Sequence, residues 1–187
     1  MNITSHFLGL TLNNSFLTEL FNSLKKYLLE NHLEKVIELQ NLNSLHITLY
    51  YFDKEINSSV LLEVKGSLEK LNKDISPIYI NQVKFFQKKS KDYLCYLSPL
   101  EASKLSQINL NLKNEYPNTI KDNNYLYIPH LTIFKIKDFF TYKNHKENIL
   151  FIINSHLEKI KIKNLSKKFN FYSVDSTHSP EKHKIIL

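Results

Sequence analysis

The apolar residues of this chain repeat one order of spacings, and that order constrains the fold more than any other feature. Short runs with a two-residue period, typical of strands, alternate with longer runs of helical period. In the first half, the spacing predicts strands over 3–12, 35–39, 45–52 and 78–86, and helices over 14–30 and 58–71. In the second half, it predicts strands over 93–97, 127–136, 159–162, 169–174 and 184–187, and helices over 99–115 and 143–156. We interpret this as the order strand–helix–strand–strand–helix–strand, present twice.

The doubled order predicts an α+β fold, formed as a single domain of two pseudo-symmetric lobes at about 1–88 and 89–187. The boundary is expected in the polar stretch 87–92. A chain of 187 residues with 42% hydrophobic residues can form one substantial core. At the start of the helix over 99–115, Ser98 is the predicted N-cap, Pro99 the first helical residue, and Glu101 the partner in a capping box.

The net charge of +7 is consistent with a partner that carries phosphate groups, such as RNA or a nucleotide. All 25 basic residues are lysines, within a composition that is rich in Asn, Ile and Lys. Bidentate guanidinium clamps on phosphate are therefore excluded. Lys, His, hydroxyl or backbone N–H groups must bind any phosphate.

The single cysteine, Cys95, excludes an internal disulfide and a metal site built from several cysteines. It lies in a predicted buried strand, where we expect the thiol to be inert. No apolar run is long enough to span a bilayer, and the N-terminus lacks the pattern of a signal peptide. We expect a cytoplasmic monomer without membrane contact.

One short segment is repeated in residue identity as well as in period. The first copy is Leu45-His46-Ile47-Thr48-Leu49, and the second is Pro129-His130-Leu131-Thr132-Ile133. Alternate residues of a strand point to the same face, so His46 and Thr48 share one face, and His130 and Thr132 do the same. If a pseudo-two-fold axis relates the halves, the two His-Thr pairs face each other across a groove.

Two histidines and two threonines on facing strands match the needs of phosphodiester cleavage. A neutral imidazole acts as a base on the attacking oxygen, and a protonated imidazole acts as an acid on the leaving oxygen. Threonine hydroxyls donate hydrogen bonds to the non-bridging phosphate oxygens, where negative charge accumulates. A single His-x-Thr on a strand is more often structural, but two copies at equivalent positions favour catalysis.

Zinc binding is the alternative use of paired histidines, but neither H-E-x-x-H nor His-x-His occurs in the sequence. Asp53 is near His46, but it has the wrong strand parity to share its face. We therefore expect no metal and no other cofactor.

Further candidates for substrate binding are aromatic and basic residues near the motifs. By strand parity, Tyr50, Phe52 and Phe134 share faces with motif residues, where they either stack on a base or pack in the core. Tyr172, in a late strand, is a candidate platform for a base. Two lysine clusters are either nucleic-acid contacts or solvated loops: Lys84, Lys88, Lys89 and Lys91, and Lys161, Lys163, Lys167 and Lys168.

At the two motifs, the chain resembles the 2H phosphoesterase superfamily, in the branch of the RNA 2′,3′-cyclic phosphodiesterases and 2′-5′ RNA ligase-like proteins. The resemblance rests on the segments 6–10, 43–52, 127–135 and 169–174. It implies a bilobal fold, with two antiparallel sheets around a central groove and helices outside. It also implies cleavage of RNA 2′,3′-cyclic phosphates or 2′,5′-linked nucleotide phosphodiesters without a cofactor.

The resemblance also implies roles for particular residues. His46 would be the acid at the 3′ leaving oxygen and His130 the base on water, with the roles exchanged for a linear 2′,5′ substrate. The family often has a basic residue, frequently Arg, five positions after the second histidine, and here it is Lys135. Lys135 is a candidate phosphate contact, although strict alternation points it away from His130 unless the strand bends there. After Phe52, the family's Leu-Gly is replaced by Asp53-Lys54.

Two other functions stay open at this point. One is an RNA-binding or nucleotide-binding module with this fold that turns over weakly or not at all. The other is a phosphodiesterase of signalling oligonucleotides or cyclic dinucleotides, because the acid–base pair contacts the phosphate and not the base.

Overall fold

The computed structural model describes residues 5–12, 15–52, 56–75, 77–117, 126–160, 164–174 and 184–187. Its strands are β1 (Ser5–Leu12), β2 (Ile37–Leu39), β3 (His46–Phe52), β4 (Ile80–Lys88), β5 (Lys91–Pro99), β6 (Leu131–Ile136), β7 (Ser166–Val174) and β8 (Lys184–Ile185). Its helices are α1 (Ser15–Glu30), α2 (Ser58–Lys73), α3 (Ala102–Glu115) and α4 (Phe139–Ile160), with a short 3-10 helix, η1 (Leu42–Ser44).

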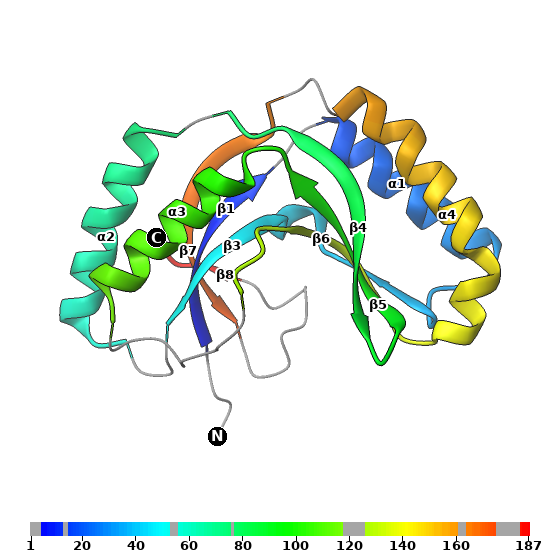
Figure 1. Ribbon diagram of the computed structural model, residues 1–187, viewed down its shortest axis with the longest axis horizontal. Coiled ribbons are helices and arrows are strands. Elements are labelled where there is room, and N and C mark those ends of the chain that lie inside the picture. The colour runs from blue at the N-terminus through cyan, green and yellow to red at the C-terminus, as the bar shows by residue number, and fades with distance from the viewer. Residues whose placement is uncertain are drawn as a thin grey trace.

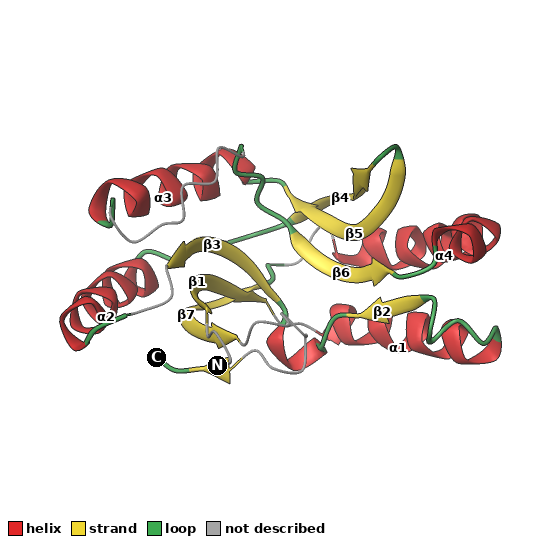
Figure 2. Cartoon of the chain, turned by 90° about the horizontal axis from the view of Figure 1, so that it is seen from below, coloured by secondary structure: helices red, strands yellow, loops and turns green. Residues whose placement is uncertain are grey.

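The strands form one antiparallel sheet in the order β4-β5-β6-β3-β1-β7-β8, and β2 pairs with β6. The α+β prediction is confirmed, and the two predicted sheets are continuous because β3 and β6 pair at Ile47 and Leu131. Helices α2 and α3 lie at one end of the sheet, and α1 and α4 lie side by side at the other (Figure 1). Figure 2 shows this division from below. No helix in the described part of the chain is long and apolar enough to cross a membrane.

The strand order is symmetric about the β3–β6 pair. β1 follows β3 on one side as β5 follows β6 on the other, and β7 then corresponds to β4. Each half of the sheet therefore takes strands from both halves of the chain. The predicted lobe boundary near residues 88 and 89 lies in the two-residue turn of the β4–β5 hairpin, where Lys89 and Ser90 have φ angles of 50° and 61°. A lobe boundary at that place would divide two strands that pair along their length.

The core lies between the helices and one face of the sheet. α1 buries the side that its spacing predicted, through Leu17, Leu20, Phe21, Leu24 and Leu28. Leu10, Ile47 and Leu131 belong to the same cluster. A second, smaller cluster is formed by Phe7 and Tyr172 with Val174. Because Phe7 alternates with Leu8 and Leu10 along β1, it lies on the sheet face away from the main core.

Two elements near the second motif differ from the prediction. β6 begins at Leu131 rather than at 127, since Pro129 lacks the N–H group that a ladder position needs. α4 begins at Phe139 and continues to Ile160. The predicted strand over 159–162 is therefore wrong for residues 159 and 160, which are helical. Its remaining residues lie outside the described residues. Asp138 accounts for the early start of α4. Its carboxylate accepts hydrogen bonds from the N–H groups of Phe140 and Thr141 at 3.0 and 3.3 Å, as an N-cap does.

The predicted capping box of α3 is also wrong. Pro99 ends β5, and the helix begins at Ala102, after Glu101. The Glu101 side chain makes no cap hydrogen bond. Its carboxylate instead accepts a hydrogen bond from the N–H of Tyr79 at 3.0 Å, so it links the helix start to the segment before β4.

Candidate active site

The two His-x-Thr segments meet at the centre of the sheet. Ile47 and Leu131 pair there, and both side chains are fully buried in the core. Their polar neighbours are partly buried: His46, Thr48, His130 and Thr132. Because alternate residues of a strand face opposite sides, these four residues lie on the sheet face away from the core. We call this face the motif face. The antiparallel direction of the pair brings Thr48 toward His130, and His46 toward Thr132.

The two imidazoles are held by matching hydrogen bonds. Nδ1 of His46 lies 2.6 Å from the carbonyl oxygen of Ser44, and Nδ1 of His130 lies 2.7 Å from that of Ile128. A carbonyl oxygen only accepts, so Nδ1 of each ring is the protonated nitrogen that donates. In the neutral rings, Nε2 is then the nitrogen with a lone pair, in position for proton transfer.

His46 packs against rings from the two strands beyond β3. The ring centroids of Phe7 and Tyr172 lie 4.7 and 4.9 Å from that of His46, and these two rings stack on each other. At Gly9, a Cβ atom would meet Cε2 of Tyr172 at 3.1 Å and Cδ2 of His46 at 3.4 Å. The missing side chain of Gly9 therefore permits this packing.

Tyr172 supports His46 rather than a base. Its side chain is fully buried, and its hydroxyl lies 2.5 Å from Oγ1 of Thr11, which also accepts a hydrogen bond from the Asn170 amide. Burial raises the pKa of the Tyr172 hydroxyl. The prediction of an open base platform is wrong, because Phe7 covers the ring. Gly9 and Thr11 are not among the site residues predicted from the sequence, although they alternate with Phe7 on the motif face.

His130 likewise packs against two aromatic rings, which come from β4 and β5. The ring centroids of Phe86, from β4, and Tyr96, from β5, lie 4.9 and 5.5 Å from its own, both in edge-to-face geometry. Burial lowers the pKa of His130, and the hydrogen bond to the Ile128 carbonyl opposes part of that effect. Burial therefore favours the neutral form of the His130 imidazole over the cation.

Each of the two motif strands, β3 and β6, contains a β-bulge. The bulge changes which residues lie on the motif face. In β3 the register with β1 passes from Thr48 directly to Tyr50, so Leu49 is the extra residue. In β6 the register with β5 passes from Thr132 to Phe134, so Ile133 is the extra residue. The two motifs therefore share the bulge as well as the His-x-Thr pattern.

Because of the bulges, the side chains of three predicted site residues point into the core. Tyr50, Phe52 and Phe134 are 2%, 4% and 1% exposed, so none of them can stack on a base. Their prediction assumed unbroken alternation, and an extra residue reverses the faces beyond it. Tyr51 takes the groove position in β3, and its side chain is 45% exposed.

The same reversal of faces places Lys135 on the motif face. It follows Phe134, which is buried, so it lies on the same face as Thr132. Its register partner on β2 is Glu38, whose carboxylate forms an ion pair with Lys137 at 2.8 Å. A phosphate contact by Lys135 requires that β6 departs from strict alternation, and the bulge is such a departure.

A pocket of about 530 Å³ opens beside Thr48 and His130. Its other lining residues come from β3, the β4–β5 hairpin, α3 and the segment before β6: Leu49, Tyr50, Tyr51, Phe86, Tyr93, Asn109, Lys113, Leu126, Tyr127 and Ile128. The Tyr127 hydroxyl donates to the carbonyl of Thr48 at 2.8 Å, and the Asn109 amide donates to that of Leu49 at 2.6 Å. These bonds satisfy two backbone carbonyl groups of β3 where the strand borders the pocket.

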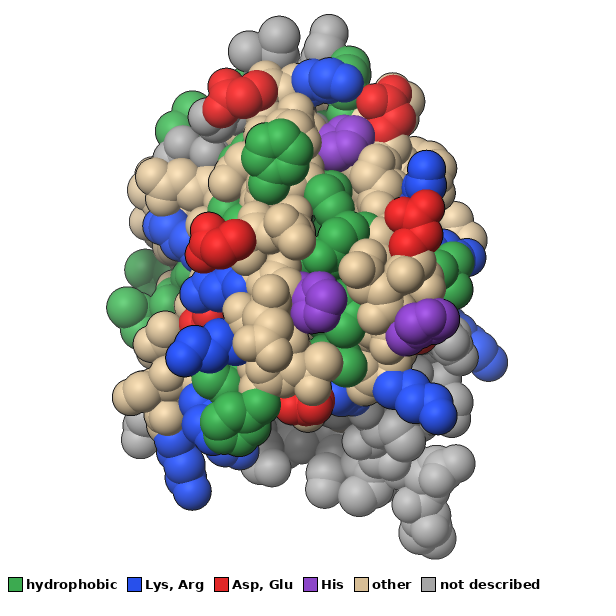
Figure 3. Space-filling model, turned by 90° about the vertical axis from the view of Figure 1, so that its right-hand side faces the viewer, with side chains coloured by type: hydrophobic (Ala, Val, Ile, Leu, Met, Phe, Trp, Pro, Cys, Tyr) green, Lys and Arg blue, Asp and Glu red, His purple; other side chains and the backbone are tan. Residues whose placement is uncertain are grey.

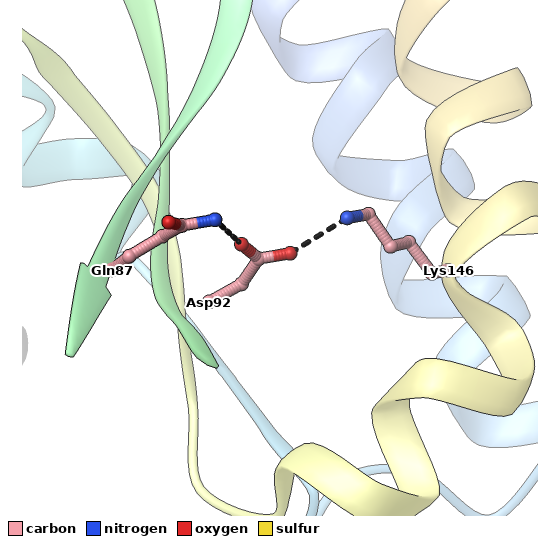
Figure 4. A network of polar contacts seen from close by, with 3 residues as sticks. All are labelled: Gln87, Asp92 and Lys146. Atoms are coloured by element: carbon pink, nitrogen blue, oxygen red, sulfur yellow. Dashed lines mark hydrogen bonds and ion pairs between the residues drawn. The ribbon is translucent and has the colours of Figure 1, made fainter. Parts of the chain in front are cut away.

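The β4–β5 hairpin, which carries Phe86 and Tyr96, is fixed to α4 by a buried carboxylate. The Asp92 side chain accepts a hydrogen bond from the Gln87 amide at 3.0 Å and pairs with the Lys146 ammonium at 2.7 Å (Figure 4). Asp92 is 5% exposed, and Lys146 also lies over the ring of Phe85. Cys95, in the same strand, is fully buried, and burial raises the pKa of its thiol, so the thiol stays protonated.

Of the remaining basic candidates, Lys84 and Lys168 share the motif face by strand register, since Lys84 pairs with Tyr96 and Lys168 pairs with Thr11. Lys84, Lys88 and Lys89 are exposed on the hairpin, and the Lys91 ammonium lies 4.3 Å from the ring centroid of Phe140. Lys161, Lys163 and the pair Asp53-Lys54 are outside the described residues, as is the side chain of Lys167. Lys168 is exposed on β7.

Two further histidines join α1 to α4. Nδ1 of His145 lies 3.0 Å from the Tyr27 hydroxyl, and Nε2 of His156 lies 3.0 Å from Oγ of Ser23. This end of the molecule shows intermixed basic, acidic and histidine side chains rather than one basic patch (Figure 3). Across the described ranges, no group of three or more His, Cys, Asp or Glu side chains could hold a metal ion.

No protein-family model and no curated protein matches this sequence. Solved structures do match its fold. Kluyveromyces marxianus Usb1 is 12% identical with a TM-score of 0.51, and the match covers 97% of each chain. TT0787 of Thermus thermophilus is 14% identical with a TM-score of 0.58, and the match covers 100% of this chain and 96% of that one. E. coli LigT complexed with 3′-AMP is 12% identical with a TM-score of 0.49, over 92% of this chain and 88% of that one.

Proposed function

We propose that this chain, which has the fold of the 2H phosphoesterases, is a phosphodiesterase that uses His46 and His130 as an acid–base pair without a metal ion. Its proposed substrates are RNA 2′,3′-cyclic phosphates or 2′,5′-linked nucleotide phosphodiesters. The likeness in fold is compatible with this chemistry, and the geometry of the site supports it.

The observation that carries the proposal is the matched state of the two rings. Each Nδ1 donates to the carbonyl two residues earlier, and each ring packs against a pair of aromatic side chains. A purely structural histidine pair has no need of two equivalent proton-transfer nitrogens on one sheet face. General acid–base catalysis needs this arrangement, because one group must take a proton while the other supplies one.

The proposed reaction on a 2′,3′-cyclic phosphate is a single displacement by water. Nε2 of His130 takes a proton from the water as its oxygen bonds to phosphorus. The bond from phosphorus to O3′ breaks, and Nε2 of protonated His46 gives its proton to that oxygen. A 2′-phosphate and a free 3′-hydroxyl result. The hydroxyls of Thr48 and Thr132 donate to the non-bridging oxygens, which carry the developing charge.

The lowered pKa of His130 favours it as the base for this substrate. A ring that stays neutral near pH 7 can accept a proton at once. Lys135 is proposed as a further phosphate contact, because the bulge at Ile133 puts it on the motif face. A linear 2′,5′ substrate would exchange the roles of the two histidines.

The test is turnover, in EDTA, of a short RNA that ends in a 2′,3′-cyclic phosphate. We expect product with the native chain and losses of at least about a hundredfold in His46→Ala and in His130→Ala. His32→Asn, at an exposed position with φ of 56°, is the matched control and should retain activity. The position of the product phosphate identifies which oxygen leaves.

Two other results would redirect the proposal. If 2′,5′-oligoadenylates or cyclic dinucleotides are cleaved instead, the substrate class changes while the acid–base pair stands. If none of these compounds is cleaved by the folded chain, but RNA binds and the double alanine variant binds equally well, the protein is a binding module.

A further inference from the structure

The two motifs are nearly equivalent, but their surroundings are not. The 530 Å³ pocket is lined by Thr48 and His130, and neither His46 nor Thr132 lines it. Its volume falls within the range of about 300–1,000 Å³ that is usual for small-molecule sites. A phosphate held between the four motif residues would therefore have this pocket on the side of Thr48 and His130.

The walls of this pocket suit a planar apolar group. Tyr51 and Tyr93 are 45% and 42% exposed, and Phe86 lies beside Tyr93 with 6.4 Å between ring centroids. The Asn109 amide nitrogen and the Tyr127 hydroxyl both donate to backbone carbonyls of β3. Exposed aromatic rings in the wall of a pocket favour stacking of a nucleobase.

Lys113 adds a positive charge to this aromatic pocket. It lies one turn after Asn109 on the same side of α3, and it is the one Lys, Asp or Glu among the described lining residues. None of the ion pairs among the described residues involves it. A lysine at this position can bind an anionic group at the far side of a nucleoside from the reacting phosphate.

We propose that Lys113 binds a second phosphate of the substrate, on the 5′ carbon of the nucleoside that occupies this pocket. This inference rests on the proposed function. The preferred substrate is then a nucleotide with phosphate on both sides of one nucleoside, as at the end of an RNA chain. A cyclic mononucleotide with a free 5′-hydroxyl would leave the lysine unused.

The kinetic test compares adenosine 2′,3′-cyclic phosphate with the same compound bearing a 5′-phosphate. We expect kcat/KM to be roughly tenfold higher for the 5′-phosphorylated compound, as one charge-assisted contact allows. Lys113→Met should bring that ratio close to one. Lys65→Met, which removes an exposed charge from α2, should keep it. Turnover of both compounds with a ratio near one in the native chain, or with a ratio that Lys113→Met does not change, would overturn the inference.

A binding measurement decides the inference even if no turnover is seen. Calorimetry would compare adenosine 3′-phosphate with adenosine 3′,5′-bisphosphate on the native chain and on the two variants. We expect the bisphosphate to bind roughly tenfold more tightly, and only Lys113→Met to abolish the difference. Absence of turnover with this binding pattern would contradict the proposed function and leave the second-phosphate site standing. Equal affinities in the native chain would contradict the site.

Discussion

Ile47 and Leu131 pair across the centre of the sheet, and both are fully buried. This pair sets the positions of the two His-x-Thr segments, because each apolar residue lies between a histidine and a threonine. Burial of both side chains in one core holds the four polar residues on the opposite face. The site is therefore positioned by the core and not by a flexible loop.

The threonine hydroxyls should contribute to the chemical step. Thr48→Val and Thr132→Val replace a hydroxyl by a methyl group of nearly the same size, so each removes a donor to the non-bridging oxygens. Loss of one such donor typically lowers kcat by about a hundredfold. Steady-state kinetics on the cyclic phosphate substrate would measure it, with circular dichroism to verify folding. A change below about threefold would show that the hydroxyls do not contact the phosphate.

Activity should persist to lower pH than an ordinary histidine base allows. Burial lowers the pKa of His130, so the neutral ring is retained below pH 6.5, and the acid limb of kcat/KM should have its midpoint below that value. Phe86→Ala exposes the ring to water and should move the midpoint up. An NMR titration of the imidazole protons would follow the same group. A native midpoint above 6.5 would contradict the assignment of His130 as base.

The same shift affects stability. Unfolded His130 binds a proton near pH 6.5, while the folded state resists protonation. The contribution of this residue to the free energy of unfolding should therefore fall as the pH drops from 6.5 through the folded pKa. Urea unfolding of the native chain and of His130→Gln, at pH 7.5 and pH 5.5, would measure the difference.

The two glycines of the chain should respond in opposite directions to alanine. Gly9→Ala puts a Cβ atom 3.1 Å from Cε2 of Tyr172 and 3.4 Å from Cδ2 of His46, which should destabilise the fold by about 1–3 kcal/mol and lower turnover. Gly66→Ala, in helix α2, meets nothing within 4 Å and should stabilise by about 0.5–1 kcal/mol. Urea unfolding of both variants tests this. Equal effects would contradict close packing at His46.

The Asp92–Lys146 pair should stabilise the hairpin that carries Phe86 and Tyr96. Lys146→Met leaves the 5% exposed carboxylate with its hydrogen bond from Gln87 but without its cationic partner, which should cost about 1–3 kcal/mol of unfolding free energy. Adding Asp92→Asn removes the buried charge, so the double variant should lose less than the sum of the single changes. Additive losses in urea unfolding would show that the two groups are not coupled.

The sequence predicted much of the local structure, including the strand alternation at the two His-x-Thr segments. Helices α1 and α2 and strands β1 and β3 lie within a few residues of their predicted bounds, and each motif shows the predicted alternation from its histidine to its threonine. Apolar spacing determines these features because each depends on neighbours a few residues apart. The pairing of the motifs followed from their repetition.

The tertiary structure decided what depends on distant neighbours. The bulges at Leu49 and Ile133 are defined only by the strands that pair with β3 and β6. Because of them, Tyr51 and Lys135 lie on the motif face in place of Tyr50 and Phe134. The burial of Tyr172 depends on Phe7, which is far away in the sequence. Residue identity and local period thus determined which groups carry the proposed chemistry. Strand register decided which side chains surround them, because register is set by contacts between distant segments.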